Sequence, residues 1–152
     1  MASPNWCGVR SNGVLRILVA LVAFASTAAL AASWEDTHQD RYCIGVQERE
    51  FRFPDGTQTD CVSSTHVLEI EKSENWYEAL GQALFYTAWW RDLNFGPREP
   101  GIILVCESPG LRKKCTERVA RLNRTVQDHN LSVSIWDCDE ADLTLAACQR
   151  VH

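Results

Sequence analysis

The sequence predicts an α/β domain built on a central mixed sheet, with an N-terminal β-meander followed by helix, strand, helix and strand. Three observations support this prediction. Apolar and polar residues alternate through most of 42–71, as in strands with one buried face. Apolar residues then recur three and four apart over 73–90 and again over 111–129, which is the period of an amphipathic helix. Between these two segments, the continuous apolar run Ile102–Val105 is typical of a strand covered on both faces.

The individual elements follow from local signals. Pro54-Asp55-Gly56 predicts a turn within the meander. Ser73, with Glu74 after it, is a suitable N-cap for the first helix. Parallel neighbouring strands need crossovers and apolar strands need cover, so helices on the faces of a mixed sheet are the simplest arrangement. The predicted strands cover 42–53, 57–62, 66–71, 101–106 and 131–137, and a helical turn covers 143–148.

Residues 1–32 have the order of a secretory signal peptide. Arg10 and Arg16 give a positive first part, Ile17–Ala25 form an apolar run, and small residues supply an A-x-A type cleavage site at the end. The uncharged stretch Ile17–Trp34 approaches the length of a membrane span, so an uncleaved anchor is the alternative, although its Ser, Thr and Ala content disfavours lipid. We expect a secreted, extracellular protein without stable membrane association after cleavage.

The mature chain is predicted to be one acidic domain. Residues 33–41 are polar without periodicity and predict a flexible arm, which leaves 42–152 as a single domain with one core. The formal charge is −5, and loss of the two leader arginines makes it −7. Net charge therefore disfavours binding to phosphates, and any basic surface must be local. The one local cation-rich set, with an ordinary solvent-exposed helix face as the alternative reading, is Arg112, Lys113, Lys114, Arg118, Arg121 and Arg124.

Six of the seven cysteines lie outside the leader, which contains Cys7. An even number without C-x-x-C spacing favours structural disulfides in an oxidising compartment over a metal site. Two N-x-S/T sequons, at Asn123 and Asn130, are glycosylation sites in a eukaryotic host and would mark exposed surface. The short sequence separations favour the pairs Cys106 with Cys115 and Cys138 with Cys148, which leaves Cys43 with Cys61.

Carboxylates converge in the predicted meander. Side chains two apart on a strand share a face, so Glu69 and Glu71 point together, and Asp60 joins them if the preceding strand pairs with theirs. Such a cluster needs protons or a cation, and hard oxygen ligands suit Mg²⁺ or Mn²⁺. The alternative is a solvated strand face on an acidic protein.

The first predicted helix carries a polar stripe beside apolar residues, formed by Asn75, Glu78, Gln82 and Tyr86 at helical spacing. This stripe is either a solvent face or the wall of a site. The tryptophans are candidates for stacking on bases, with packing as the alternative. Those considered are Trp76, Trp89, Trp90 and Trp136.

Residues 50–105 resemble a small PD-(D/E)xK, or restriction-endonuclease-like, nuclease family. The resemblance rests on the ordered segments 54–61, 65–71, 76–86 and 100–104, and Gln82-x-x-x-Tyr86 is similar to the Q-x-x-x-Y element of the RecB-like branch. It implies a restriction-endonuclease-like fold, with Gln82 and Tyr86 bordering the active site.

The same resemblance implies that Asp60 and Glu69 are the metal-binding acids, with Glu50 as an additional acid. Glu71 stands where many members have lysine, which is a departure from the family pattern. Lys72, one residue on, is expected to point to the opposite face unless it turns back at the strand end. An ammonium group would polarise the attacking water, whereas glutamate can act only as a base or a further ligand.

Two functions follow as hypotheses. The first is a secreted nuclease that uses Mg²⁺ or Mn²⁺ to hydrolyse phosphodiester bonds in nucleic acid. The second is a catalytically inactive binding module or effector on the same scaffold, with a protein partner. The aligned acids favour the first hypothesis, and the missing lysine and the acidic charge favour the second.

Overall fold

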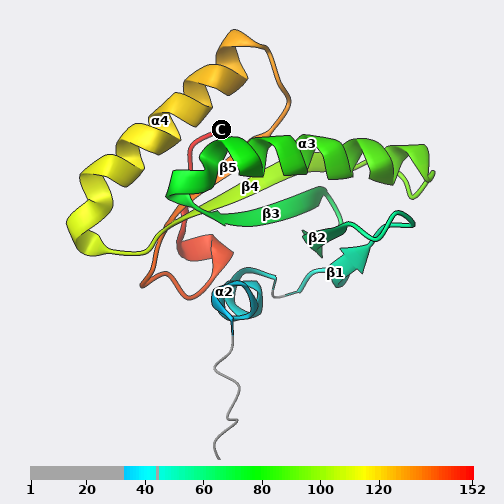
Figure 1. Ribbon diagram of the computed structural model, residues 1–152, viewed down its shortest axis with the longest axis horizontal. Helices are drawn as coiled ribbons and strands as arrows, with labels where there is room; N and C mark the ends of the chain where they lie inside the picture. The colour runs from blue at the N-terminus through cyan, green and yellow to red at the C-terminus, as the bar shows by residue number, and fades with distance from the viewer. Residues whose placement is uncertain (1–32, 44) are drawn as a thin grey trace, which may run out of the picture. The chain divides into compact units, whose positions relative to one another are not determined.

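The computed structural model describes residues 33–43 and 45–152, so the predicted leader and Cys7 lie outside the described residues. One mixed sheet contains six strands in sequence order (Figure 1). β1 to β3 are antiparallel, β3 to β5 are parallel, and β6 returns antiparallel to β5. The strands are β1 (Glu48–Arg52), β2 (Gln58–Val62), β3 (His66–Lys72), β4 (Glu99–Cys106), β5 (Ser134–Asp139) and β6 (Gln149–Arg150).

Helices cover both faces of the sheet (Figure 1). α3 (Trp76–Asp92) and α4 (Arg112–Asp128) form the parallel crossovers and pack on one face, where Ile102 and Leu104 are fully buried. α2 (Trp34–Tyr42) packs on the other face against Ile103 and its neighbours. Successive side chains of β4 therefore enter two different cores, which explains its uninterrupted apolar run. The predicted α/β class and mixed sheet are confirmed.

The structure corrects the prediction of a flexible arm, because α2 occupies nearly all of 33–41. Ser33 and Asp36 form a reciprocal capping box at the N-terminus of α2. His38 and Gln39 are buried although both are polar, and Tyr42 is buried with them. The helix thus has a buried face without an apolar sequence pattern, which is why periodicity did not reveal it.

Other boundaries also differ from the predictions. The first strand begins at Glu48 rather than at Tyr42, because Tyr42 ends α2. Ser73 lies inside a 3₁₀ turn, Ser73–Asn75, and its side chain does not cap α3. The short strand β6 was not predicted, whereas the turn near 143–148 is present as a 3₁₀ helix over Leu145–Ala147.

Three disulfides join the pairs predicted from sequence separation: Cys43–Cys61, Cys106–Cys115 and Cys138–Cys148. The first ties the end of α2 to β2, the second ties α4 to β4, and the third closes the C-terminal segment onto β5. Several disulfides in one small domain point to an oxidising, extracellular or secreted setting. Over the described residues, no helix is both long and apolar enough to cross a membrane.

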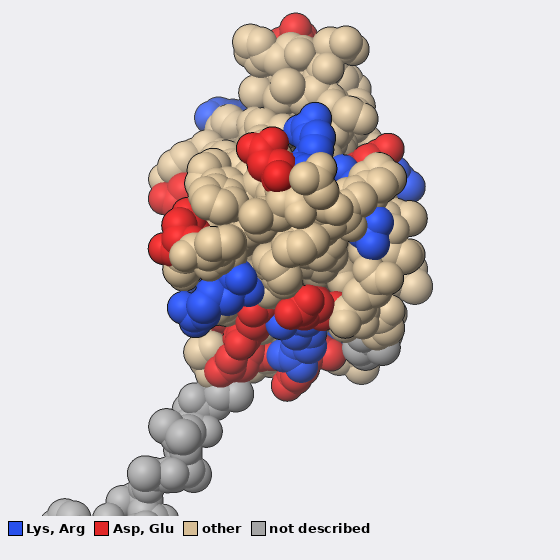
Figure 2. All heavy atoms as spheres, turned by 90° about the vertical axis from the view of Figure 1, so that its right-hand side faces the viewer, with Lys and Arg blue, Asp and Glu red and all other residues tan. Residues whose placement is uncertain are grey.

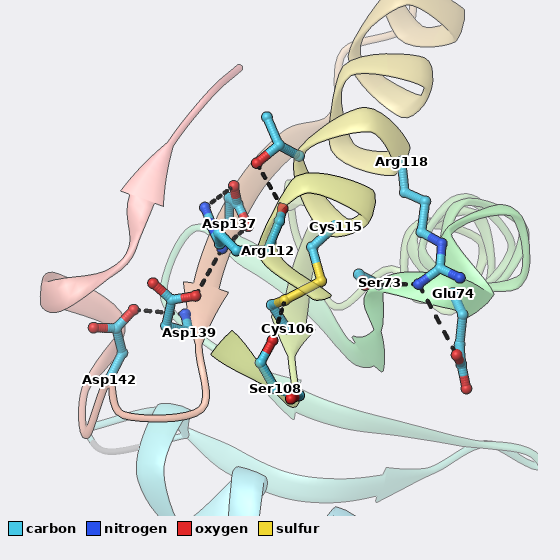
Figure 3. Close-up of a disulfide and its surroundings, with 11 residues drawn as sticks. Ser73, Glu74, Cys106, Ser108, Arg112, Cys115, Arg118, Asp137, Asp139 and Asp142 are labelled. Atoms are coloured by element: carbon cyan, nitrogen blue, oxygen red, sulfur yellow. Dashed lines mark hydrogen bonds and ion pairs between the residues drawn. A yellow bond between two sulfur atoms is a disulfide. The ribbon is translucent and has the colours of Figure 1, made fainter. Parts of the chain in front are cut away.

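The start of α4 is fixed by a partly buried ion pair next to the Cys106–Cys115 disulfide (Figure 3). Arg112 donates to both carboxylate oxygens of Asp137 and, over 2.9 Å, to Asp139. The Asp137 side chain is 5% exposed, whereas that of Arg112 is 35% exposed. Burial raises the pKa of Asp137, and the guanidinium of Arg112 opposes this rise.

We expect Arg112→Met to lower the free energy of unfolding by roughly 2 kcal/mol at neutral pH, since it leaves a buried carboxylate without its cation. The loss should shrink in acid, where Asp137 is protonated and needs no counter-charge. Urea denaturation at both pH values measures it, with Arg121→Met, an exposed arginine of α4, as the control. An equal loss at both pH values would contradict this explanation.

Candidate functional site

β2 and β3 separate beyond a short paired stretch. They pair antiparallel, as in the predicted meander, with Cys61 opposite Leu68 and Val62 opposite Val67. Further along, side chains replace the strand-to-strand bonds: Thr59 donates to the Leu68 carbonyl over 3.1 Å, and Asp60 accepts from the Ile70 N–H over 2.7 Å. The gap between the two strands is therefore lined by polar side chains from β2.

A cavity of about 230 Å³ opens at this gap. It brings together Asp60, Glu69, Glu71 and Gln82, four of the residues predicted for the site. Side chains from α2, from the two strands and from α3 contribute to it. The full lining is Trp34, Glu35, Gln58, Asp60, Glu69, Ile70, Glu71 and Gln82.

Asp60 is 7% exposed, and its carboxylate lies between neighbouring elements. One oxygen accepts from Ile70, and the other accepts from the Gln39 side chain of α2 over 2.8 Å. Burial raises the pKa of Asp60 to about 7; these two hydrogen bonds oppose the rise, and the nearby charge of Glu35 adds to it. No cation pairs with Asp60 among the described residues.

Glu69 is even more enclosed, at 4% exposed. Burial, followed by the negative charge of Asp60, raises the pKa of Glu69 well above its ordinary value. Its Oε1 atom is buried and has no hydrogen-bond partner among the described residues, and the same is true of Oε1 of Gln39. Unpartnered buried oxygens are costly, so this place in the fold calls for a proton or a cation.

The oxygen ligands at the cavity fit a hard divalent cation by their chemistry. Asp60 and Glu69 are neighbouring acids, and Glu35 and Glu71 lie in the same lining. Within residues 33–43 and 45–152, no three His, Cys, Asp or Glu side chains are already arranged as a metal-binding group. Oε1 of Glu69, which has no partner among the described residues, is a buried acceptor that a proton or a cation could satisfy.

Glu71 and Lys72 are both engaged by neighbours. Glu71 accepts from the Asn75 side chain over 3.1 Å, at the start of the helical segment. Lys72 forms an ion pair with Glu107 at 2.9 Å, and its ammonium lies 5.3 Å from the centre of the Trp34 ring. Lys72 does not line the cavity, in keeping with its expected direction on the strand.

Tyr86 and Glu50 also lie outside the lining. The Tyr86 ring stacks on Phe53 at 5.3 Å, and burial, followed by the charge of Glu69, raises the pKa of its hydroxyl. Tyr86 therefore belongs to a hydrophobic core cluster and lies near Glu69, outside the cavity. Glu50 is exposed on the edge strand β1 and has a φ of 51°, between the paired residues Arg49 and Phe51.

Sequence reasoning missed the contribution of α2. Glu35 and Trp34 line the cavity, and Gln39 donates to Asp60. The capping box of Ser33 and Asp36 was the available signal for this helix. Without the helix, nothing in the sequence indicated that these side chains face Asp60.

The predicted basic helix face is partly neutralised. Arg112 pairs with two aspartates, and Arg118 lies 4.0 Å from Glu74 and donates to Ser73 (Figure 3). None of its six cations lines the acidic cavity. This face is thus a weak candidate for contacting phosphates next to the cavity.

Comparisons of the chain with models of protein families, with curated proteins and with solved structures found no match.

Proposed function

We propose that the protein is a secreted, metal-dependent phosphodiesterase that cleaves nucleic acid, with an active site of the PD-(D/E)xK type at the gap between β2 and β3. The observation that carries the proposal is the buried Glu69 carboxylate, whose Oε1 has no partner among the described residues, beside Asp60. The resemblance to the nuclease family selects these same two acids as the metal ligands. Its restriction-endonuclease-like fold is part of the proposal.

The roles follow from position. Asp60 and Glu69 would hold Mg²⁺ or Mn²⁺, and Glu35 and Glu71 are the further carboxylates of the lining. A bound divalent cation supplies charge stabilisation at a phosphodiester oxygen and lowers the pKa of bound water. Gln82 would orient the substrate from α3. Tyr86 would pack near Glu69, outside the cavity, and help to hold the Glu69 side chain in position.

The departure from the family pattern shapes this proposal. Glu71 occupies the lysine position, and Lys72 is held by Glu107 away from the lining. Proton transfer from water would then fall to a carboxylate such as Glu71. Glu50 is not assigned a ligand role, because it lies exposed on β1 outside the cavity.

A second candidate function is a secreted binding module or effector that has lost turnover. The specific observation in its favour is that the described lining of the acidic cavity contains no lysine or arginine. In this case the raised pKa values of Asp60 and Glu69 mean that buried protons, rather than a cation, relieve the repulsion.

Cleavage assays on protein from a secreting host that expresses the full chain separate the two functions. Single- and double-stranded DNA and RNA are incubated with Mg²⁺, Mn²⁺ or EDTA. We expect cleavage with either cation and none in EDTA, and a loss of about a hundredfold in rate for Asp60→Asn.

Glu48→Gln, an exposed acid on β1, is the control and should cleave as the unmodified protein does. Cleavage that survives in EDTA or in Asp60→Asn would overturn the site assignment. Absence of both cleavage and cation binding would favour the binding module.

A further inference from the structure

Seven aromatic side chains form one contact cluster next to the acidic cavity. Phe53, Tyr86 and Trp90 are buried in a hydrophobic core, and the other four rings are partly or largely exposed above them. Neighbouring rings lie between 4.9 and 6.3 Å apart, from Phe85 on α3 through the β1–β2 hairpin to the segment after α3. Phe85 and Phe95 are 46% and 47% exposed, so both rings of this pair are accessible from solvent. We name the set the aromatic ridge: Phe51, Phe53, Phe85, Tyr86, Trp89, Trp90 and Phe95.

The ridge is continuous with the cavity along two elements. On α3, Gln82 lines the cavity and Phe85 and Trp89 follow at i+3 and i+7, so they share one side of the helix. On β2, Gln58 lines the cavity, and its Oε1 accepts from Arg52 of the neighbouring strand over 2.9 Å. A chain-like ligand that enters the cavity would thus meet exposed rings on leaving it.

The charge around the ridge indicates what kind of contact it can make. Figure 2 shows the right-hand side of Figure 1, where α3 and the β1–β2 hairpin end, and uncharged atoms dominate the middle of this face. Arg98 lies 5.8 Å from the centre of the Trp90 ring, and Arg52 lies between Phe51 and Phe53 in sequence. With a net charge of −5 for the whole chain, phosphate contacts are few, so stacking would have to supply most of the affinity.

We propose that the aromatic ridge binds the unpaired bases of a single-stranded nucleic acid whose backbone enters the acidic cavity. The inference rests on the proposed function and deepens it by naming the substrate class. Stacked bases in a duplex cannot present their faces to Phe85 or Phe95, whereas every unpaired base can. Binding should therefore depend on base faces and only weakly on salt.

Fluorescence anisotropy in EDTA tests this inference without cleavage. The probes are a short labelled single strand, the same sequence as a duplex, and an abasic strand of equal length. We expect the single strand to bind at least about tenfold more tightly than either of the others. Phe85→Ala should weaken single-strand binding about tenfold, and Phe85→Ala combined with Phe95→Ala should weaken it further.

Tyr77→Ala is the matched control, because Tyr77 is 58% exposed on the same helix and contacts only the Trp76 ring among the described aromatic residues. Equal affinity for single strand and duplex, no measurable binding of the single strand, or equal effects of Phe85→Ala and Tyr77→Ala would overturn the inference. If Phe85→Ala did not affect cleavage, the proposed nuclease function would be retained, but the role of the aromatic ridge in binding the substrate would be rejected. If Phe85→Ala abolished single-strand binding but the unmodified protein showed no cleavage, the role of the ridge in binding would be supported and the nuclease function would be rejected.

Discussion

The cation-free protein is expected to lose stability as the pH rises, by on the order of 4 kcal/mol between about pH 4 and pH 8. Burial raises the pKa of Asp60 from 3.8 to about 7. Between these values the folded state keeps a proton that the unfolded chain has released, so the free energy of unfolding falls with rising pH. The raised pKa of Glu69 acts in the same direction. Urea denaturation in EDTA across this range measures the slope.

Asp60→Asn should remove much of that slope and make the protein more stable at pH 8. Its amide oxygen can still accept from the Ile70 N–H. Its N–H₂ group can donate to Oε1 of Gln39 once the Gln39 amide turns over, because Nε2 of Gln39 faces this position in the unmodified protein. Glu48→Gln, at an exposed position, should keep the slope. If stability instead rose from pH 4 to pH 8, or if Asp60→Asn left the slope unchanged, the buried carboxyl group would not be its source.

The same experiment separates the two candidate functions. If Asp60 and Glu69 hold a divalent cation, excess Mg²⁺ should restore stability at pH 8 and have little effect at low pH, where both ligands are protonated. At a concentration a hundred times the dissociation constant, the gain is about 2.7 kcal/mol. The gain should disappear in Asp60→Asn. A cation-independent slope would favour the binding module.

The fold was predictable wherever a sequence period reflects burial. The alternation of β3 and the apolar run of β4 predicted their faces. Short sequence separations predicted two of the disulfides between described cysteines, and Cys43–Cys61 was the pair that remained. α2 was not predictable from periodicity, because its buried face is made of His38, Gln39 and Tyr42 rather than aliphatic residues. Gln39 bonds to Asp60 at the candidate site, His38 bonds to Glu140, and Tyr42 belongs to a hydrophobic core.

Strand alternation also predicted part of the candidate site. The two-residue period placed Glu69 and Glu71 together, and pairing of the strands brought in Asp60. The separation of β2 from β3 could not be anticipated, because it depends on side chains of Thr59 and Asp60 taking over backbone hydrogen bonds. The direction of Lys72 followed from alternation, whereas its partner Glu107 comes from beyond the end of β4 and has no local signal.

Replacing both cysteines of the Cys43–Cys61 pair with serine should lower the free energy of unfolding by about 3 kcal/mol, from the loop entropy that an 18-residue separation removes from the unfolded chain. The bond also holds the end of α2 against β2, next to the strand position of Asp60. Its loss should therefore loosen the Gln39 hydrogen bond to Asp60 and weaken Mg²⁺ binding. Thermal unfolding with and without Mg²⁺ measures both effects.

The Cys138–Cys148 pair provides the matched comparison, because its 10-residue separation gives a similar entropic contribution of about 3 kcal/mol. It closes the C-terminal segment onto β5, and neither of its cysteines lines the acidic cavity. Serine at both of these positions should therefore lower stability by a similar amount and leave the Mg²⁺ response intact. If both double variants lost that response equally, global loosening would explain it. A loss confined to the Cys43–Cys61 variant would show that α2 completes the site, because, of the two disulfides compared, this one joins the end of α2 to the strand that carries Asp60.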